Sequence, residues 1–135
     1  MSEPIWLRTD VILAIHRRLL ADHGGLTGLR DAGLLDSALG RPKQLLAYGS
    51  PDLYALAAAY AVGLVRNHPF VDGNKRIAFM SAYVFLARHG LTLIASEDDA
   101  AQAVLRLAAG DMQEAQFAQW LRAHAAEANS VEQKN

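Results

Sequence analysis

Apolar residues recur every three or four positions along most of the chain, which is the spacing of amphipathic helices. The first helix is predicted to be capped by Thr9 or Asp10 and to end at Gly24-Gly25, because glycine adopts the left-handed conformation that closes a helix. A short second helix follows the potential cap Asp31 and is expected to break at Gly40-Arg41-Pro42. The apolar positions that define these two helices are Ile12, Ile15, Leu19, Leu20, Leu34, Leu35, Ala38 and Leu39.

The third and fourth helices are predicted to form the centre of the protein. Ser50-Pro51-Asp52 is a typical helix start, with a hydroxyl cap, a proline in the first position and an acid in the first turn, and this helix should continue to about Asn67. The fourth helix is expected from about Lys75 to His89, with Gly90 as its stop. Because apolar residues surround the fourth helix on nearly every side, we expect it to be the most buried one.

The remaining segments complete a helical bundle. Residues 91–94 are apolar but too few to distinguish a strand from an extended loop, and Ser96 is expected to cap a fifth helix that ends near Ala109. Asp111 with Glu114 predicts a capping box for a sixth helix. The sequence therefore predicts an all-α bundle of about six helices in a single domain over residues 1–125. A polar tail over residues 126–135 is expected to fray.

Composition and charge narrow the possible functions. Hydrophobic residues make up 52% of the 135 positions, which is enough for a core, and the chain has no cysteine for disulfides or thiolate chemistry. The formal net charge of -1 argues against direct binding of nucleic acid, which usually requires a basic surplus. No apolar run reaches the roughly 18 residues of a membrane span, and no secretory signal is visible, so a cytoplasmic location is the default expectation.

The loop between the third and fourth helices, His68-Pro69-Phe70-Val71-Asp72-Gly73-Asn74-Lys75-Arg76, has the composition of a phosphate site. Gly73 and Asn74 would lie at a helix N-terminus, where free N–H groups and the positive end of the helix dipole bind anions. Lys75 and Arg76 add cationic contacts, and Asp72 offers a hard oxygen ligand for Mg²⁺.

An imidazole is a suitable proton acceptor near neutral pH, so His68 can take a proton from an attacking hydroxyl. Each of these residues alone is more often a turn, a solvated charge or a packing residue. Together, at the start of a buried helix, they supply the parts that phosphoryl or nucleotidyl transfer requires.

The nine residues from His68 to Arg76 resemble the signature of the Fic/Doc family, His-Pro-Phe-x-Asp/Glu-Gly-Asn-Gly/Lys-Arg. The upstream run from Gly28 to Leu39, followed by Arg41-Pro42, is similar to death-on-curing (Doc) toxins, as is the end of the fourth helix, Phe85-Leu86 to His89-Gly90. The resemblance covers roughly residues 5 to 122. It implies an all-helical Fic fold in which the signature loop joins two core helices.

The resemblance also implies roles for the residues of the loop. His68 would be the catalytic base, with Lys75 and Arg76 also in catalytic positions. Asp72 would hold Mg²⁺, and four consecutive residues would hold the phosphates of ATP: Gly73, Asn74, Lys75 and Arg76.

Two positions distinguish the branches of the family. Members that transfer AMP have a glycine where this chain has Lys75, and they often carry a second arginine where this chain has Phe79. The lysine is the Doc form. Doc toxins phosphorylate elongation factor Tu, using ATP in a reversed orientation, and thereby stop translation. We therefore expect a phosphate-transferring toxin, with an AMP transferase acting on a protein hydroxyl as the alternative.

Many Fic proteins inhibit themselves with a helix that carries Ser/Thr-x-x-x-Glu-Gly/Asn. The segment that comes nearest, Ser96 to Ala100, lacks the glutamate. We therefore expect inhibition in trans, by a Phd-like antitoxin whose disordered tail folds into a groove on the toxin.

Two further alternatives remain open, a catalytically silent binding module with the Fic scaffold and an RNA-cleaving toxin. The RNA-cleaving toxin is the weaker of the two, because the chain has no basic surplus and its loop has no second obvious acid–base residue. Trp6 and Trp120 are interpreted as core-packing residues. The other histidines are interpreted as surface or capping residues: His16, His23, His89 and His124.

Overall fold

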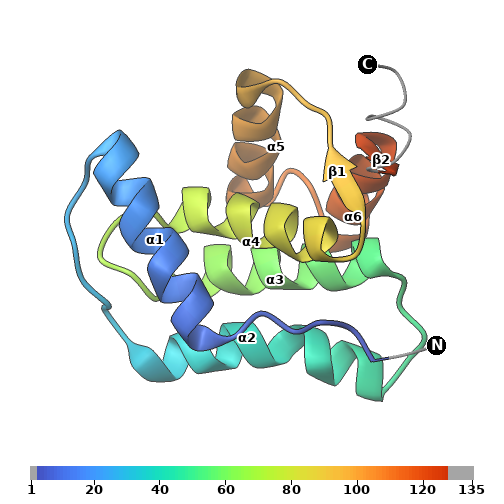
Figure 1. Ribbon diagram of the computed structural model, residues 1–135, viewed down its shortest axis with the longest axis horizontal. Coiled ribbons are helices and arrows are strands. Elements are labelled where there is room, and N and C mark those ends of the chain that lie inside the picture. The colour runs from blue at the N-terminus through green and yellow to red at the C-terminus, as the bar shows by residue number, and fades with distance from the viewer. Residues whose placement is uncertain (1–2, 128–135) are drawn as a thin grey trace.

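The computed structural model describes residues 3–127, which form six helices and a two-stranded sheet (Figure 1). The helices are α1 (Thr9–His23), α2 (Ala32–Ala47), α3 (Leu53–Asn67), α4 (Asn74–Arg88), α5 (Glu97–Ala109) and α6 (Glu114–Ala123). The strands are β1 (Leu91–Leu93) and β2 (Ala125–Glu127), which pair antiparallel. The predicted all-α class and the six helices are confirmed.

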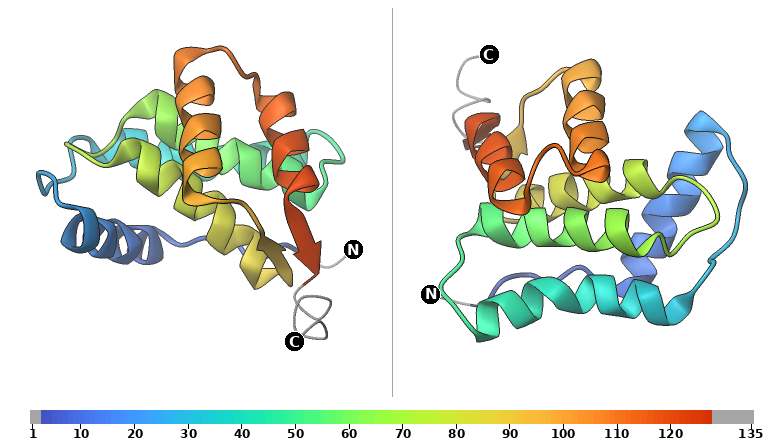
Figure 2. Two further views of the ribbon diagram at one scale, coloured as in Figure 1. Left: turned by 90° about the horizontal axis from the view of Figure 1, so that it is seen from above. Right: turned by 180° about the vertical axis from the view of Figure 1, so that it is seen from behind.

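The two helices that flank the signature loop lie side by side at the centre of the molecule. Helix α2 packs on one side of α3, α6 packs on the other, and α1 and α5 pack against α4 (Figures 1 and 2). The expectation that the fourth helix is the most buried one is wrong. In α3 every residue from Leu56 to Leu64 is buried, whereas the apolar side chains of Phe79 and Met80 in α4 are only half-buried because they line a cleft.

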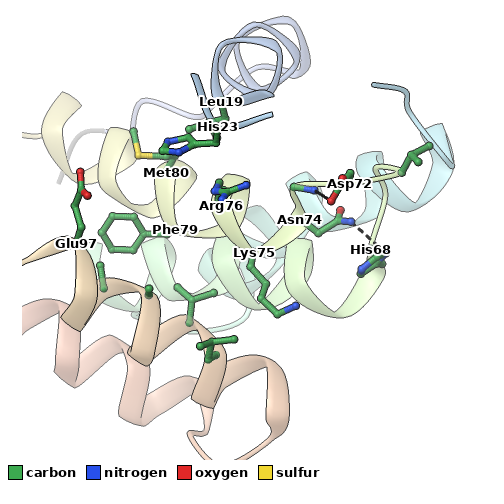
Figure 3. A pocket seen from close by; sticks show the side chains of 16 residues that line it. Leu19, His23, His68, Asp72, Asn74, Lys75, Arg76, Phe79, Met80 and Glu97 are labelled. Atoms are coloured by element: carbon green, nitrogen blue, oxygen red, sulfur yellow. Dashed lines mark hydrogen bonds between the residues drawn. The ribbon is translucent and has the colours of Figure 1, made fainter. Parts of the chain in front are cut away.

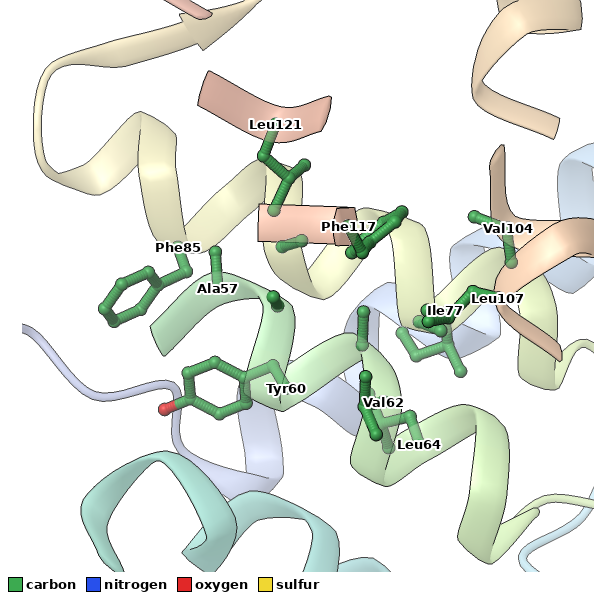
Figure 4. Close-up of a cluster of buried hydrophobic side chains, with 14 of the residues drawn as sticks. Ala57, Tyr60, Val62, Leu64, Ile77, Phe85, Val104, Leu107, Phe117 and Leu121 are labelled. Atoms are coloured by element: carbon green, nitrogen blue, oxygen red, sulfur yellow. The ribbon is translucent and has the colours of Figure 1, made fainter. Parts of the chain in front are cut away.

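The hydrophobic core gathers around α3 and draws on all the other helices. Tyr60, Val62 and Leu64 of α3 lie near Ile77 and Phe85 of α4, with further side chains from α5 and α6 above them (Figure 4). Trp6 and Trp120 pack against the edge of this cluster, as the sequence indicated. The core thus holds α3 and α4, and the loop between them, in a fixed relation.

Four helix boundaries differ from the prediction. The N-cap of α1 is Arg8, without a side-chain cap, and not Thr9 or Asp10. Helix α2 continues through Pro42 to Ala47, because the proline removes a single backbone hydrogen bond and its ring is buried. Helix α3 is capped by the Asp52 side chain, which accepts from the Ala55 N–H at 2.8 Å, so Ser50 and Pro51 precede the helix.

The fourth boundary is the start of α6. Its N-cap is Gln113 and not Asp111. The Gln113 N–H donates to the Gln116 side chain at 2.7 Å. The Asp111 N–H still donates to the Arg106 carbonyl at the end of α5, and the Glu114 side chain pairs with Arg41. The Asp111 N–H and the Glu114 side chain, which the expected capping box would pair, therefore bond to other partners.

Two residues of the predicted tail belong to strand β2. Ala126 and Glu127, assigned from the sequence to a frayed tail, pair with Thr92 and Leu91 of β1. The rest of the predicted tail, residues 128–135, lies outside the described residues. Within residues 3–127, no helix has the length and apolar character needed to cross a membrane.

Candidate active site

The signature loop leaves α3 at His68 and enters α4 at Asn74 (Figure 3). His68 ends α3 in the left-handed conformation, with φ 52° and ψ 53°, and its N–H donates to the Leu64 carbonyl at 3.2 Å. It is the one non-glycine residue with positive φ in the part of the chain that the structure describes. Such backbone conformations persist where surrounding contacts hold them, and they are frequent at functional sites.

Asn74 is buried beneath the loop and connects its two ends. Its Oδ1 accepts from the Phe70 N–H at 3.0 Å, and its Nδ2 donates to the Phe70 carbonyl at 2.9 Å. These two bonds fix the orientation of the amide, because the oxygen can only accept and the nitrogen can only donate. The same Nδ2 lies 3.1 Å from Nδ1 of His68 and donates its second hydrogen there.

This contact determines where the neutral His68 ring carries its proton. Because Nδ1 accepts from Asn74, the proton lies on Nε2 in this arrangement. Asn74 was predicted from the sequence as a phosphate-binding residue only. In the structure it also orients the imidazole.

The carboxylate of Asp72 is exposed and is held by two backbone donors. Its Oδ2 accepts from the Leu26 N–H at 3.1 Å, and its Oδ1 accepts from the Gly73 N–H at 2.9 Å. These two hydrogen bonds are the main causes of a lowered pKa for Asp72, and the nearby charge of Arg76 adds to them. The absence of a side chain at Gly25 permits this close approach, since a Cβ there would lie 2.9 Å from Asp72 Oδ2.

The start of α4 has the geometry expected for anion binding. Gly73 is the N-cap, with φ 77°, and the first N–H that bonds back to the helix start is that of Ile77, which donates to the Gly73 carbonyl at 3.0 Å. The N–H groups of the preceding turn therefore have no intrahelical acceptor. The exposed side chains of Lys75 and Arg76 leave this turn on different sides of α4 (Figure 3).

All six residues predicted for the site line one cleft of about 680 Å³. Its polar end is formed by the loop and the first turn of α4: His68, Asp72, Gly73, Asn74, Lys75 and Arg76. Its other end is mostly apolar and is formed by α1, α4 and α5, with Phe79, Met80, Val104 and Leu105 among the lining residues. The fold therefore gathers the predicted base, metal ligand and phosphate-binding residues at one end of one cleft.

The interpretation of His16 as a surface or capping residue is wrong. Its ring is buried and stacks on Phe70 with 3.7 Å between ring centroids, and its Nε2 lies 2.8 Å from the Asp72 carbonyl oxygen. A signal was present in the sequence, since Ile12, His16 and Leu20 share one apolar helix face at intervals of four. A histidine in such a stripe is buried with a specific partner.

The interpretation is correct for the three other histidines. His89 and His124 are the C-caps of α4 and α6, and their Nδ1 atoms lie 2.7 Å from the carbonyls of Phe85 and Trp120. His23 is exposed at the end of α1 and lines the cleft.

The segment between α1 and α2 contacts the signature loop, and sequence reasoning assigned no role in the site to its residues. Leu29 forms an antiparallel bridge with Phe70, and the Val71 N–H donates to the Gly28 carbonyl at 3.0 Å. Arg30 donates to the carbonyls of His68 and Asn67. These contacts join residues about forty positions apart, so no local pattern could reveal them.

Comparisons with known proteins bear on the family resemblance. A model of the Fic/DOC family matches residues 6–86, which is more than half of the chain and includes the whole signature loop. The resemblance was expected to extend to about residue 122, so most of it is matched, while α5 and α6 lie beyond the match.

Two similar proteins carry Doc names. The chain is 36% identical over 90 residues to "Protein kinase doc" of Escherichia phage P1, an alignment that covers 66% of this chain and 71% of that protein. It is 47% identical over 78 residues to "Toxin Doc" of Mycolicibacterium smegmatis, which covers 56% of this chain and 59% of that protein. The resemblance to Doc-type toxins is therefore confirmed, and the chain belongs to the Fic/DOC family.

Proposed function

We propose that this protein is a Doc-type toxin that transfers the γ-phosphate of ATP to a hydroxyl of a translation protein, with elongation factor Tu as the first candidate. The observation that carries the proposal is Lys75, which stands in the first turn of α4 beside the Gly73-Asn74 anion site. Lysine adds bulk and charge where AMP-transferring members of the family have glycine. The name of the phage P1 relative, a protein kinase, supports the same assignment.

The first turn of α4 would bind the phosphates of ATP. Its N–H groups and the helix dipole attract anions, and Gly73 permits a close approach of the backbone. Arg76 can form a bidentate contact with phosphate oxygens, and Lys75 can neutralise the charge that develops on the transferred group. These contacts position the γ-phosphorus for attack from the cleft.

His68 would accept the proton of the target hydroxyl. The hydroxyl oxygen forms the new bond to the γ-phosphorus, the bond from that phosphorus to the β,γ-bridging oxygen breaks, and ADP leaves with its electron pair. The lone pair of the neutral ring lies on Nδ1, where it accepts from Asn74. The hydroxyl therefore displaces the Asn74 amide from Nδ1, because a proton moved to Nδ1 would face the Asn74 N–H donor.

Asp72 would hold Mg²⁺, which supplies charge neutralisation for the phosphates when bound. Residues 3–127 contain no group of three or more histidine, cysteine or acidic side chains that could form a complete metal site. A single ionised carboxylate still fits this ion, because Mg²⁺ keeps several waters and takes substrate phosphates as further ligands. The lowered pKa of Asp72 keeps its carboxylate charged at the pH of the reaction.

Incubation of the protein with elongation factor Tu, Mg²⁺ and either γ-labelled or α-labelled ATP tests the proposal, with mass spectrometry of the target. We expect label from the γ position only and a phosphate adduct. Transfer of label from the α position would instead establish AMP transfer. No adduct in either reaction would favour a silent binding module and would overturn the enzymatic proposal for this target.

Two variants make the assay specific for the site. His68→Ala is expected to abolish the adduct, because the proton acceptor is lost while the phosphate-binding turn remains. Lys43→Ala is the matched control, since Lys43 is an exposed lysine of α2 outside the cleft. Retained activity in the His68 variant would remove His68 from the role of base.

We further propose that an antitoxin inhibits the protein in trans. The self-inhibitory pattern is absent from residues 96–100, and Ser96 there caps α5 by accepting from the Asp99 N–H at 3.0 Å. The apolar end of the cleft, between α1 and α5, offers a surface for the folded tail of a Phd-like antitoxin. Expression of the chain alone should slow growth, and the His68→Ala variant should not. Harmless high expression of the intact chain would contradict the toxin assignment.

A further inference from the structure

The backbone conformation of His68 requires restraint by surrounding contacts. With φ 52° and ψ 53°, His68 stands in a region that side chains with a Cβ rarely occupy. Its conformation sets the direction in which the imidazole leaves the end of α3. Whatever holds the His68 carbonyl therefore also helps to aim the ring.

Arg30 holds that carbonyl from outside the cleft. Its Nε donates to the His68 carbonyl at 2.7 Å, and one of its terminal nitrogens donates to the Asn67 carbonyl at 2.9 Å. The last carbonyls of a helix lack intrahelical donors and lie at the negative end of the helix dipole, so a planar cation with two donors suits them. The backbone continues this contact, because the N–H groups of Arg30 and Asp31 donate to the Pro69 carbonyl at 2.7 and 3.0 Å.

The ring of His68 is held from the opposite direction by Asn74, which donates to Nδ1. His68 is thus restrained at two points, at its carbonyl by Arg30 and at its ring by Asn74. Arg30 is itself exposed and is not among the residues that line the cleft. Its side chain therefore reaches the reaction only through His68.

We propose that Arg30 is a positioning residue for His68: its guanidinium keeps the end of α3 in the conformation that presents the imidazole to Asn74 and to the cleft. This proposal rests on the role of His68 in the proposed function. It makes a separate prediction about the ring, which can be tested without any catalytic assay. Loss of the guanidinium releases the carbonyl, and the His68–Asn74 contact then becomes partly populated.

The test compares Arg30→Gln and Arg30→Lys with the matched control Arg66→Gln. Arg66 is an exposed arginine in the last turn of α3 that makes no side-chain hydrogen bond within residues 3–127. Nitrogen-15 NMR of the imidazole should show the Nε2–H form for His68 in the wild-type protein and in the control. The Arg30→Gln variant should show a mixture of both neutral forms, and Arg30→Lys should lie between, because lysine can donate to only one carbonyl at a time.

The kinetic assay provides the second measurement. We expect kcat for phosphate transfer to fall by about 10- to 100-fold in Arg30→Gln, since small misplacements of a reacting group have effects of this size. KM for ATP should stay within about twofold, because the phosphate-binding turn is not altered. The control should retain both constants.

Each outcome separates the two proposals. An unchanged His68 spectrum in Arg30→Gln would overturn the positioning role, even if kcat or the urea midpoint fell, because Arg30 would then serve only as a cap of α3. A changed spectrum with no phosphate transfer by the wild-type protein would support the positioning role and contradict the proposed function.

Discussion

At the scale of single residues, the side-chain amide of Asn74 makes three contacts, two with the backbone of Phe70 and one with the His68 ring. We predict that Asn74→Ala lowers the free energy of unfolding by about 1–3 kcal/mol, because the buried N–H and carbonyl of Phe70 lose their partners. The His68 ring should lose its preference for the Nε2–H form at the same time. Urea unfolding and nitrogen-15 NMR measure the two effects.

The matched control for this substitution is Asn67→Ala. Asn67 is the last residue of α3, is only half-buried, and donates to the Leu34 carbonyl at 2.9 Å. Its loss should also lower stability but should leave the proton on Nε2 of His68. A shared change of the His68 spectrum in both variants would show that the ring responds to general loosening and not to Asn74.

Asp72 gives a prediction about pH. Its pKa is lowered in the folded protein by the Leu26 and Gly73 N–H groups, from an ordinary value of 3.8. A lowered folded-state pKa means that the carboxylate stabilises the fold above the unfolded-state pKa, and that this stability is lost as the pH falls through the folded-state pKa. The stability difference between wild type and Asp72→Asn should therefore be constant above about pH 5 and should shrink below pH 4.

Urea unfolding at a series of pH values measures this difference. Asp36→Asn is the control, since Asp36 is an exposed acid of α2 that makes no side-chain hydrogen bond within the described residues. A wild-type stability that stays above that of Asp72→Asn by the same amount down to pH 2 would contradict the role of the two backbone donors.

The residues of the site divide by how far apart their partners lie in the sequence. His68, Asp72, Gly73, Asn74, Lys75 and Arg76 could be predicted because a single turn places them together at a helix start. The burial of His16 could be read from its apolar helix face. The partners of His16 and Arg30 could not be assigned, because they lie 56 and 38 positions away. Their partners are backbone carbonyls, which any sequence supplies and which therefore leave no mark on residue identity.

At the scale of the elements, the interior of helices was predictable and their ends were less so. The periodic apolar residues located all six helices, and Ser96 and Gly110 bound α5 as expected. Proline misled the prediction for α2, because the local sequence does not reveal whether the packing of the Pro42 ring offsets the lost hydrogen bond. The choice between Ser50 and Asp52 as the cap of α3 depended on a difference of two residues between equally good caps.

The contact between α2 and α3 depends on one glycine. A Cβ at Gly63 would lie 3.1 Å from both the Cα and the carbonyl oxygen of Ala38, which are backbone atoms that cannot rotate away. We predict that Gly63→Ala lowers the free energy of unfolding by about 1–3 kcal/mol through overpacking, although alanine is the better helix former. Gly40→Ala in α2 is the matched control, because a Cβ there meets nothing within 4 Å.

The control should instead stabilise the protein, by about 0.5–1 kcal/mol, as expected for glycine to alanine in a helix interior. Thermal or urea unfolding of the two variants therefore gives shifts of opposite sign. Equal shifts, in either direction, would show that the close approach of α2 and α3 is not what selects glycine at position 63.

At the scale of the whole molecule, the segment before α1 fastens the N-terminal part of the chain to the central helices. The Ile5 N–H donates to Nε2 of His89 at the end of α4, and the Leu7 N–H donates to the Tyr60 hydroxyl in α3, both at 3.0 Å. This segment leads directly into α1, which carries His16 to the signature loop. The placement of α1, and with it one support of the loop, depends on these two contacts.

Of the two side chains that accept from this segment, His89 and Tyr60, Tyr60 is the buried one. Its pKa is raised because burial disfavours the phenolate. We predict that Tyr60→Phe lowers the free energy of unfolding by about 1–3 kcal/mol at neutral pH, because the buried Leu7 N–H loses its acceptor. Tyr83→Phe is the control, since Tyr83 is half-buried and its hydroxyl makes no hydrogen bond in the described part of the chain.

The same residue adds a prediction for alkaline solution. A raised folded-state pKa means that the contribution of Tyr60 is fully present below its ordinary value of 10.0 and is lost as the pH rises through the folded-state pKa. Wild-type stability should therefore fall above pH 10 more steeply than that of Tyr60→Phe, and urea midpoints between pH 8 and 11 would show it. If the stability of the two proteins fell equally with pH, the Tyr60 hydroxyl would be in contact with water. The Leu7–Tyr60 hydrogen bond would then not hold the N-terminal segment, and through it α1, in place beside the signature loop.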